Sequence, residues 1–373
     1  MKLKYYENLD GVRGIAAIMV VIYHIFYYPN LSYLANLNTF QKFTEFGRHG
    51  VPIFFVLSGF VITRILINTR ENKNYFGSFY KKRILRILPL YYLFLIIYYY
   101  LIPFLSEDGQ RVEFILRVPF YCYIQNMTDV FNIKASGPGH YWTLSIEEHF
   151  YILWPLVVYL VKPKNLVKLI GITIILVLIL RYFMLNAGLP IDKFTFTRID
   201  QILLGAYLAV LEWKNFFSDS RNVLKLGLTG VLVFPLIIGA YFLSDKFLMI
   251  SEMTSQLFLG LFFFSMIGCL VFLKTNNFIN KVLASRTLQF FGRISYGIYV
   301  WHILVILILN RFFITEIFIV DFTLPIVLTI LIAHLSYKYY EKIFLRMKDQ
   351  KVRSIDIRTL LGLKSKPAKI KEN

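Results

Sequence analysis

The sequence predicts an all-α, polytopic integral membrane protein with about ten transmembrane helices and both termini in the cytoplasm. Three observations carry this prediction: 57% of the 373 residues are hydrophobic, only 17% are charged, and the mean hydropathy is +0.58. A soluble globule of this size needs more polar surface than this composition supplies. The net charge of +19 could indicate a nucleic-acid partner. Because cationic loops also orient membrane helices, we expect a lipid bilayer and no nucleic acid as partner.

Apolar runs long enough to cross a bilayer divide the chain. A helix needs about 17 to 25 residues to span roughly 30 Å of hydrocarbon. Ten such runs begin near Val12, Gly50, Ile84, Ser145, Leu166, Arg198, Leu226, Thr254, Ile294 and Ile319. The first run, from Ile15 to Tyr28, ends in aromatic residues and Pro29 rather than at a small-residue cleavage site. We therefore expect a retained helix and not a cleaved signal peptide.

Lys and Arg residues gather in alternate loops between these runs. With the amino terminus in the cytoplasm, the segments on that side hold 31 of the 41 basic residues, as the positive-inside rule requires. We expect a multi-pass protein of the inner (cytoplasmic) membrane, with a membrane domain over residues 1–343 and a basic cytoplasmic tail over residues 344–373. The longest outer loop, Ser106 to Tyr141, is suited to covering a site. Cys122 and Cys269 are too few for a disulfide framework, and we expect two free thiols.

The first helix carries two ionisable residues on one face. Arg13 and His24 are eleven residues apart, which at about 100° per residue is three turns plus roughly 20°. Arg13 then lies at the cytoplasmic boundary, and His24 lies beyond the midplane towards the outside. Asp10 is one turn before Arg13 and can pair with it. An ionisable side chain in a membrane is a functional candidate, although Arg13 could instead mark the helix end and His24 could bond a neighbouring helix.

The second and fourth helices add polar residues at related depths. Ser58 and Gly59 lie near the middle of the second helix, where a small-residue pair indicates close helix packing and Ser58 is a less favoured nucleophile. In the fourth helix Trp142 fits an interfacial belt, and Glu147 lies just below it, at the depth of His24. Because adjacent residues point about 100° apart on a helix, Glu147 and Glu148 are not expected to face one site equally.

The sixth and ninth helices complete this set of polar residues. Arg198 and Asp200 lie at the outer level in the sixth helix, and Tyr296 and His302 lie along the ninth. The first, fourth and sixth helices thus bring polar groups to similar depth, which indicates one buried polar site. A His beside a carboxylate is the usual general base near neutral pH. Since neither His24 nor His302 shows ligand spacing within its own helix, we expect no metal site.

A basic cluster precedes the third helix on the cytoplasmic side. It contains Lys81, Lys82, Arg83 and Arg86. Such a cluster is explained by topology alone, because any cytoplasmic loop here would be basic. Alternatively, these cations could hold the phosphates of an anionic donor.

These residues together resemble acyltransferase family 3, the membrane O-acyltransferases. The Arg13 and His24 pair within LDGVRGIAAIMVVIYH is similar to the first-helix signature of that family. Five further blocks follow in the family's order: FFVLSGF (54–60), KKRILRILPLYY (81–92), YWTLSIEEHFYILWP (141–155), TRIDQILLGAYLA (197–209) and SYGIYVWH (295–302). The resemblance covers about residues 5 to 343. It departs at His149, where the family commonly has Gln, and the sequence shows none of the extracytoplasmic hydrolase-like domain that some members carry at the carboxyl end.

The resemblance implies transfer of an acyl group, usually acetyl from acetyl-CoA, to a hydroxyl of a glycan or lipid-linked saccharide on the outer side. It implies no permanently bound cofactor, and it gives His24 the role of base or acyl carrier with Glu147 as its orienting partner. Lys82, Arg83 and Arg86 then bind the donor, and Arg13 lines its path. The alternative is a secondary transporter that uses the buried ionisable residues for proton coupling, although such transporters often show two similar halves and none are visible here. The acceptor, the acyl length and the oligomeric state stay open.

Overall fold

The computed structural model describes residues 3–27, 44–105, 111–242, 248–272 and 277–348. Within these ranges the chain is helical and contains no β-strand, which confirms the all-α prediction. The long helices are α1 (Glu7–Tyr27), α3 (Gly50–Thr69), α4 (Tyr75–Leu105), α6 (Trp142–Leu160), α7 (Pro163–Asn186), α8 (Thr195–Trp213), α9 (Ser220–Phe242), α10 (Leu248–Phe272), α12 (Arg286–Phe312) and α13 (Phe318–Ser336). The shorter elements are η2 (Phe46–His49), α5 (Phe114–Tyr121), η3 (Gly139–Tyr141), η4 (Phe216–Ser218), α11 (Phe278–Leu283), the π-helical turn η5 (Tyr337–Glu341) and α14 (Lys342–Met347).

Each of the ten expected runs coincides with one long helix. In the described part of the chain, eight helices are long and apolar enough to cross a membrane, so the protein is a multi-pass membrane protein. The two long helices outside this set are α6 and α8, which carry several of the charged candidates. Ten membrane spans and a cytoplasmic position of both termini therefore stay predictions. The tail from residue 349 onward and loop residues 106–110 lie outside the described residues.

The third long helix begins earlier than the sequence predicted. It starts at Tyr75 rather than near Ile84, so the basic cluster lies within α4 and not in front of it. Residues 81–86 carry four cations, which interrupt the apolar pattern without breaking the helix, because Lys and Arg are good helix formers. This placement fixes the direction of each cation around the axis of α4.

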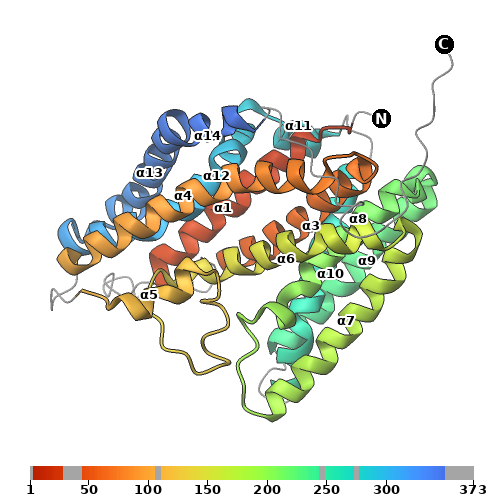
Figure 1. Ribbon diagram of the computed structural model, residues 1–373, viewed down its shortest axis with the longest axis horizontal. Helices are drawn as coiled ribbons and strands as arrows, with labels where there is room; N and C mark the ends of the chain where they lie inside the picture. The colour runs from red at the N-terminus through yellow and green to blue at the C-terminus, as the bar shows by residue number, and fades with distance from the viewer. Residues whose placement is uncertain (1–2, 28–43, 106–110, 243–247, 273–276, 349–373) are drawn as a thin grey trace.

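The helices form one bundle around α3 and α8 (Figure 1). In that view α1, α4, α12 and α13 lie on one side of this central pair, and α7, α9 and α10 lie on the other. The α3–α8 contact is so close that a Cβ on Gly59 would lie 1.8 Å from the carbonyl oxygen of Ile202, and one on Gly205 would lie 1.9 Å from that of Val56. The small-residue packing expected at Gly59 is thus confirmed.

A second close contact joins α1 to α12. A Cβ on Gly292 of α12 would lie 2.1 Å from the carbonyl oxygen of Asp10 on α1. The two helices stay in contact along their length, because small residues let the backbones approach where no side chain intervenes. The consequence for the site is that His24 on α1 faces His302 of α12.

Candidate functional site

A cavity of about 110 Å³ lies among α1, α3, α4, α6 and α12. Its lining includes three arginines and two glutamates: Arg13, Arg83, Arg86, Glu147 and Glu148. Apolar side chains of α3, including Phe54 and Phe55, form much of the remaining wall. The sequence predicted most of these charged residues as site candidates, and the structure brings them to one cavity.

Three arginines border the cavity from α1 and α4. The Arg13 guanidinium is 2.8 Å from the Asp10 carboxylate, which confirms the expected pair one turn apart. Asp10 also accepts a hydrogen bond from the Tyr5 hydroxyl, and burial together with this bond raises the pKa of Tyr5 to about 12. On α4, Arg83 lies with its guanidinium carbon 5.6 Å from the centre of the Tyr151 ring.

The basic cluster of α4 divides between the cavity and the surface. Arg83, which is half-buried, and Arg86, which is also exposed to solvent, line the cavity, whereas the exposed Lys82 does not border it. Residues three apart share a face of a helix, and a neighbour one position away points about 100° aside. The structure therefore groups two of the three expected donor-binding residues and separates the third from them.

The Glu147 carboxylate is held by hydroxyl groups. Ser58 donates to Glu147 Oε1 at 2.7 Å, and Tyr151 donates to Glu147 Oε2 at 3.1 Å. The Tyr151 hydroxyl is also 3.1 Å from Ser58 Oγ. The expected pairing of Glu147 with His24 is wrong, because α6 packs against α3, which presents Ser58 to the carboxylate.

Glu148 borders the same cavity as Glu147, which the sequence did not predict. The two carboxylates nevertheless differ in their partners. Glu147 accepts from two hydroxyls, whereas Glu148 Oε1 is buried without a hydrogen-bond partner in the described chain. The cavity thus contains one carboxylate that already accepts two hydrogen bonds and one carboxylate oxygen that can still accept a proton or a hydrogen bond.

Tyr299 and Thr143 contribute hydroxyl groups at the cavity. Both residues line it, and their hydroxyl oxygens are in hydrogen-bond contact with each other. The Tyr299 hydroxyl also donates to the carbonyl oxygen of His140 at 2.6 Å. The same ring contacts two imidazoles, with centroids 5.4 Å from His140 and 5.6 Å from His302. Tyr299 therefore separates the ionic cavity from a second polar centre.

That second centre is a cluster of three imidazoles from α1, η3 and α12. The ring of His302 lies 4.9 Å from that of His24 and 4.8 Å from that of His140, and the His24 and His140 rings are 6.4 Å apart. His24 Nδ1 and His302 Nε2 are within 3.2 Å. Burial is the main cause that lowers the pKa of His140 well below its usual value. Among the described residues, no ion pair joins these imidazoles to a carboxylate.

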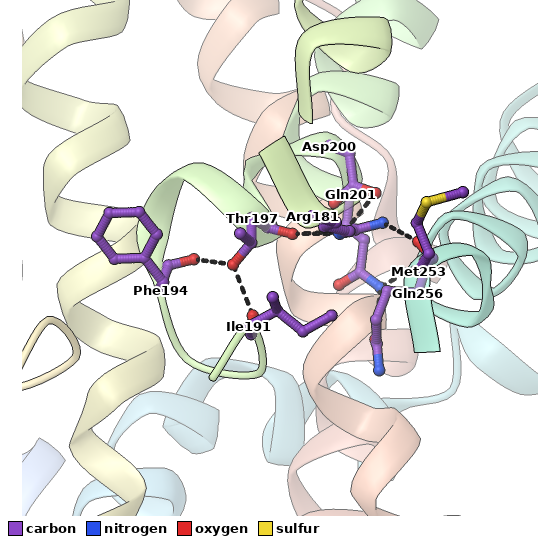
Figure 2. Close-up of polar contacts among 8 residues, drawn as sticks. All are labelled: Arg181, Ile191, Phe194, Thr197, Asp200, Gln201, Met253 and Gln256. Carbon is purple, nitrogen blue, oxygen red and sulfur yellow. Dashed lines mark hydrogen bonds and ion pairs between the residues drawn. The ribbon is translucent and has the colours of Figure 1, made fainter. Parts of the chain in front are cut away.

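Asp200 does not belong to either centre. It forms a fully buried ion pair with Arg181 at 2.8 Å in the contact of α7 and α8 (Figure 2). Arg181 also donates to the carbonyl oxygens of Thr197 and Met253, and Gln201 bonds the carbonyl oxygen of Gln256 on α10. The prediction that Asp200 joins the outer polar site is therefore wrong. The missed residue is Arg181, whose signal was a single arginine in an otherwise apolar run.

The remaining candidates lie around these centres. The Arg198 guanidinium stacks on the Trp142 ring at 5.5 Å, and its Nε has no hydrogen-bond partner among the described residues. Tyr296 lines the cavity and donates to the carbonyl oxygen of Ile87 at 2.8 Å.

His149, the departure from the family pattern, hydrogen-bonds Thr195 at the start of α8. Cys122 and Cys269 are free thiols. Over the described ranges, no three His, Cys, Asp or Glu side chains are arranged to hold a metal ion.

Comparison with known proteins places this geometry among acyl-transferring enzymes. The family profile described as an acyltransferase domain matches residues 6–338. The O-acetyltransferase OatA of Staphylococcus aureus strains NCTC 8325 and COL is 28% identical over 363 residues, which cover 91% of this chain and 57% of the relative. A second protein of strain COL, proposed to be an O-acetyltransferase, is 30% identical over 369 residues that cover 92% of this chain and 58% of the relative. The chain spans little more than half the length of these relatives. No solved structure matches it.

Proposed function

The chain belongs to acyltransferase family 3, and on this premise we propose that it is a membrane O-acyltransferase. The proposed reaction moves an acyl group, acetyl by preference, from acyl-CoA on the cytoplasmic side to a hydroxyl of a cell-surface glycan or lipid-linked saccharide on the outer side. The O-acetyltransferase names of its relatives support acetyl transfer to oxygen. The family match favours this function over the secondary-transporter alternative.

The observation that carries the proposal is the succession of two different polar centres. Arginines, Tyr299 and Thr143 line one cavity, and the ring of Tyr299 also contacts two imidazoles of the cluster. Arg83 and Arg86 suit the phosphates of a CoA donor, because guanidinium groups bind phosphate with charge-assisted hydrogen bonds. In the proposal the thioester end of the donor then extends past Arg13 towards Tyr299.

His24 is the proposed general base. Its imidazole takes the proton from the acceptor hydroxyl as that oxygen attacks the thioester carbonyl. The carbon–sulfur bond then breaks, and the thiolate of CoA takes the proton back from the imidazolium. An imidazole can also carry an acyl group. Rapid denaturation at neutral pH after mixing with radiolabelled acetyl-CoA distinguishes the two routes, because only a carrier leaves label on His24.

Transfer from labelled acetyl-CoA by the full chain in liposomes tests the proposal. His24→Ala should abolish transfer while membrane insertion and the detergent-extracted yield stay unchanged. His334→Ala is the matched control, because His334 lies on α13, contacts the ring of Phe290 and borders neither polar centre. This control should transfer at the wild-type rate. Retained transfer in His24→Ala would refute the assignment of His24 as the general base.

A further inference from the structure

We propose that His302 is the positioning residue of His24: its Nε2 accepts a hydrogen bond from His24 Nδ1–H, which leaves His24 Nε2 as the nitrogen that takes the substrate proton. This inference rests on the proposed function, since it concerns the same base. It replaces the carboxylate partner that the sequence suggested with a neutral imidazole from α12.

The tautomer of His302 follows from its backbone neighbour. Its Nδ1 is 2.6 Å from the carbonyl oxygen of Tyr299. A carbonyl oxygen only accepts hydrogen bonds, so Nδ1 of His302 carries a hydrogen. The side chain is fully buried, and an isolated buried charge is costly. The ring is therefore neutral, and its Nε2 carries a lone pair.

The tautomer of His24 follows in the same way. Its Nδ1 is 2.8 Å from the carbonyl oxygen of Val20 and 3.2 Å from His302 Nε2. Both neighbours are acceptors, so Nδ1 of His24 carries a hydrogen that the two share as a three-centre bond. The opposite assignment would set the lone pair of Nδ1 against the lone pairs of the Val20 carbonyl oxygen. Since a neutral imidazole has one donor and one acceptor, His24 Nε2 is the basic nitrogen.

The two acceptors have different effects on the ring. Val20 lies one turn before His24 on the same helix and bonds the side chain locally. His302 belongs to α12, so its bond fixes the direction of the imidazole relative to the cavity and the other rings. When Nε2 of His24 takes the acceptor proton, the Nδ1–H bond to His302 strengthens, because a charged donor makes the stronger hydrogen bond. This is the orienting and stabilising role that a carboxylate has in a hydrolase triad.

The surroundings hold His302 in place for this role. Tyr299 packs its ring against His302 while its hydroxyl is tied to His140 and Thr143. The close contact of α1 and α12 at Gly292 keeps the two helices at a fixed separation. A base whose supporting residues are locked by packing keeps its geometry during the reaction.

Two substitutions at His302 separate an acceptor role from a merely structural one. His302→Leu removes the acceptor, and we expect kcat to fall by about 100-fold while KM for both substrates changes by less than about 2-fold. His302→Gln retains an acceptor oxygen near the position of Nε2, and we expect it to restore kcat to within about 10-fold of wild type. Equal losses in the two variants, or wild-type kcat in His302→Leu, would overturn the positioning role.

A spectroscopic measurement tests the hydrogen bond without any substrate. The chain has only six histidines, so selective ¹⁵N labelling gives a simple NMR spectrum in lipid bilayers. We expect a coupling between His24 Nδ1 and His302 Nε2 across the N–H···N bond in the wild type, and its loss in both variants. A wild-type spectrum without this coupling overturns the inference even if transfer depends on His24. If the coupling is present but the wild type transfers no acyl group, the hydrogen bond stands and only the proposed function fails.

Discussion

The buried Arg181–Asp200 pair makes a quantitative test of what holds α7, α8 and α10 together (Figure 2). Arg181→Met would leave the Asp200 carboxylate buried and unpaired, which costs about 3 to 5 kcal/mol. It would also remove the additional hydrogen bonds from the guanidinium to the carbonyl oxygens of Thr197 and Met253, which lie within α8 and α10; a hydrogen bond contributes about 1 kcal/mol. We therefore expect Arg181→Met to be strongly destabilising, at about 4 kcal/mol or more.

Asp200→Asn should lower the free energy of unfolding less than Arg181→Met does. Asp200→Asn keeps an acceptor for the guanidinium, which also retains its backbone carbonyl partners, so we expect a loss of about 2 kcal/mol. The double variant Arg181→Met with Asp200→Leu contains no unpaired charge and should be more stable than Arg181→Met alone. Thermal midpoints in detergent, followed by the fluorescence of the four tryptophans at a single scan rate, measure these differences.

The acyl-transfer activity of Asp200→Asn decides whether the Arg181–Asp200 pair has only a structural role. Because neither residue lines the cavity or joins the imidazole cluster, Asp200→Asn should keep kcat within about 3-fold of wild type below its unfolding midpoint. The reasoning is refuted if Asp200→Asn unfolds at the wild-type midpoint but has lost transfer. Asp200 would then act in the reaction, as its depth in the sequence first suggested.

Two further predictions follow from the geometry of α4 and α3. Arg83→Ala should raise KM for acetyl-CoA by about 10-fold or more, because it removes a guanidinium from the cavity. Replacement of the exposed Lys82 by Ala should change this KM by less than about 2-fold. Equal effects of the two substitutions in steady-state kinetics would show that the cluster acts only through its net charge. Gly59→Ala should lower the thermal midpoint, because its Cβ would lie 1.8 Å from the carbonyl oxygen of Ile202, while Gly171→Ala on α7 meets no atom within 4 Å and should not. A Gly59→Ala protein with the wild-type midpoint would contradict the close α3–α8 contact.

Contacts within one helix were predictable, because helix geometry relates them directly. The Asp10–Arg13 pair follows from a spacing of three residues, and the structure confirms it. The close packing at Gly59 follows from the absence of a side chain, and the structure confirms that too. The first prediction needs only the helix period of about 3.6 residues. The second needs only the small size of the residue, which predicts a close contact with another helix but does not identify that helix as α8.

Contacts between helices were less predictable, because depth alone does not say which helices pack together. Glu147 and His24 were expected to meet at a similar depth, yet α3 places Ser58 against Glu147. Likewise Asp200 pairs with Arg181 of α7, its neighbour in the bundle. Both carboxylates do have specific polar partners, as buried ionisable groups require, but the choice of partner depends on helix packing that a single sequence does not contain.

The separation of the two polar centres has a consequence for acid–base chemistry. Positive charges near an imidazole disfavour its protonated form, and a carboxylate favours it. Tyr299 lines the cavity that holds the arginines and glutamates, and its ring also contacts the imidazole cluster. In the proposed reaction, a base in this cluster responds mainly to its neighbour His302 and to the arriving acceptor, and less to the charge of the donor. The arginines of the cavity would then bind the donor without setting the protonation of the proposed base.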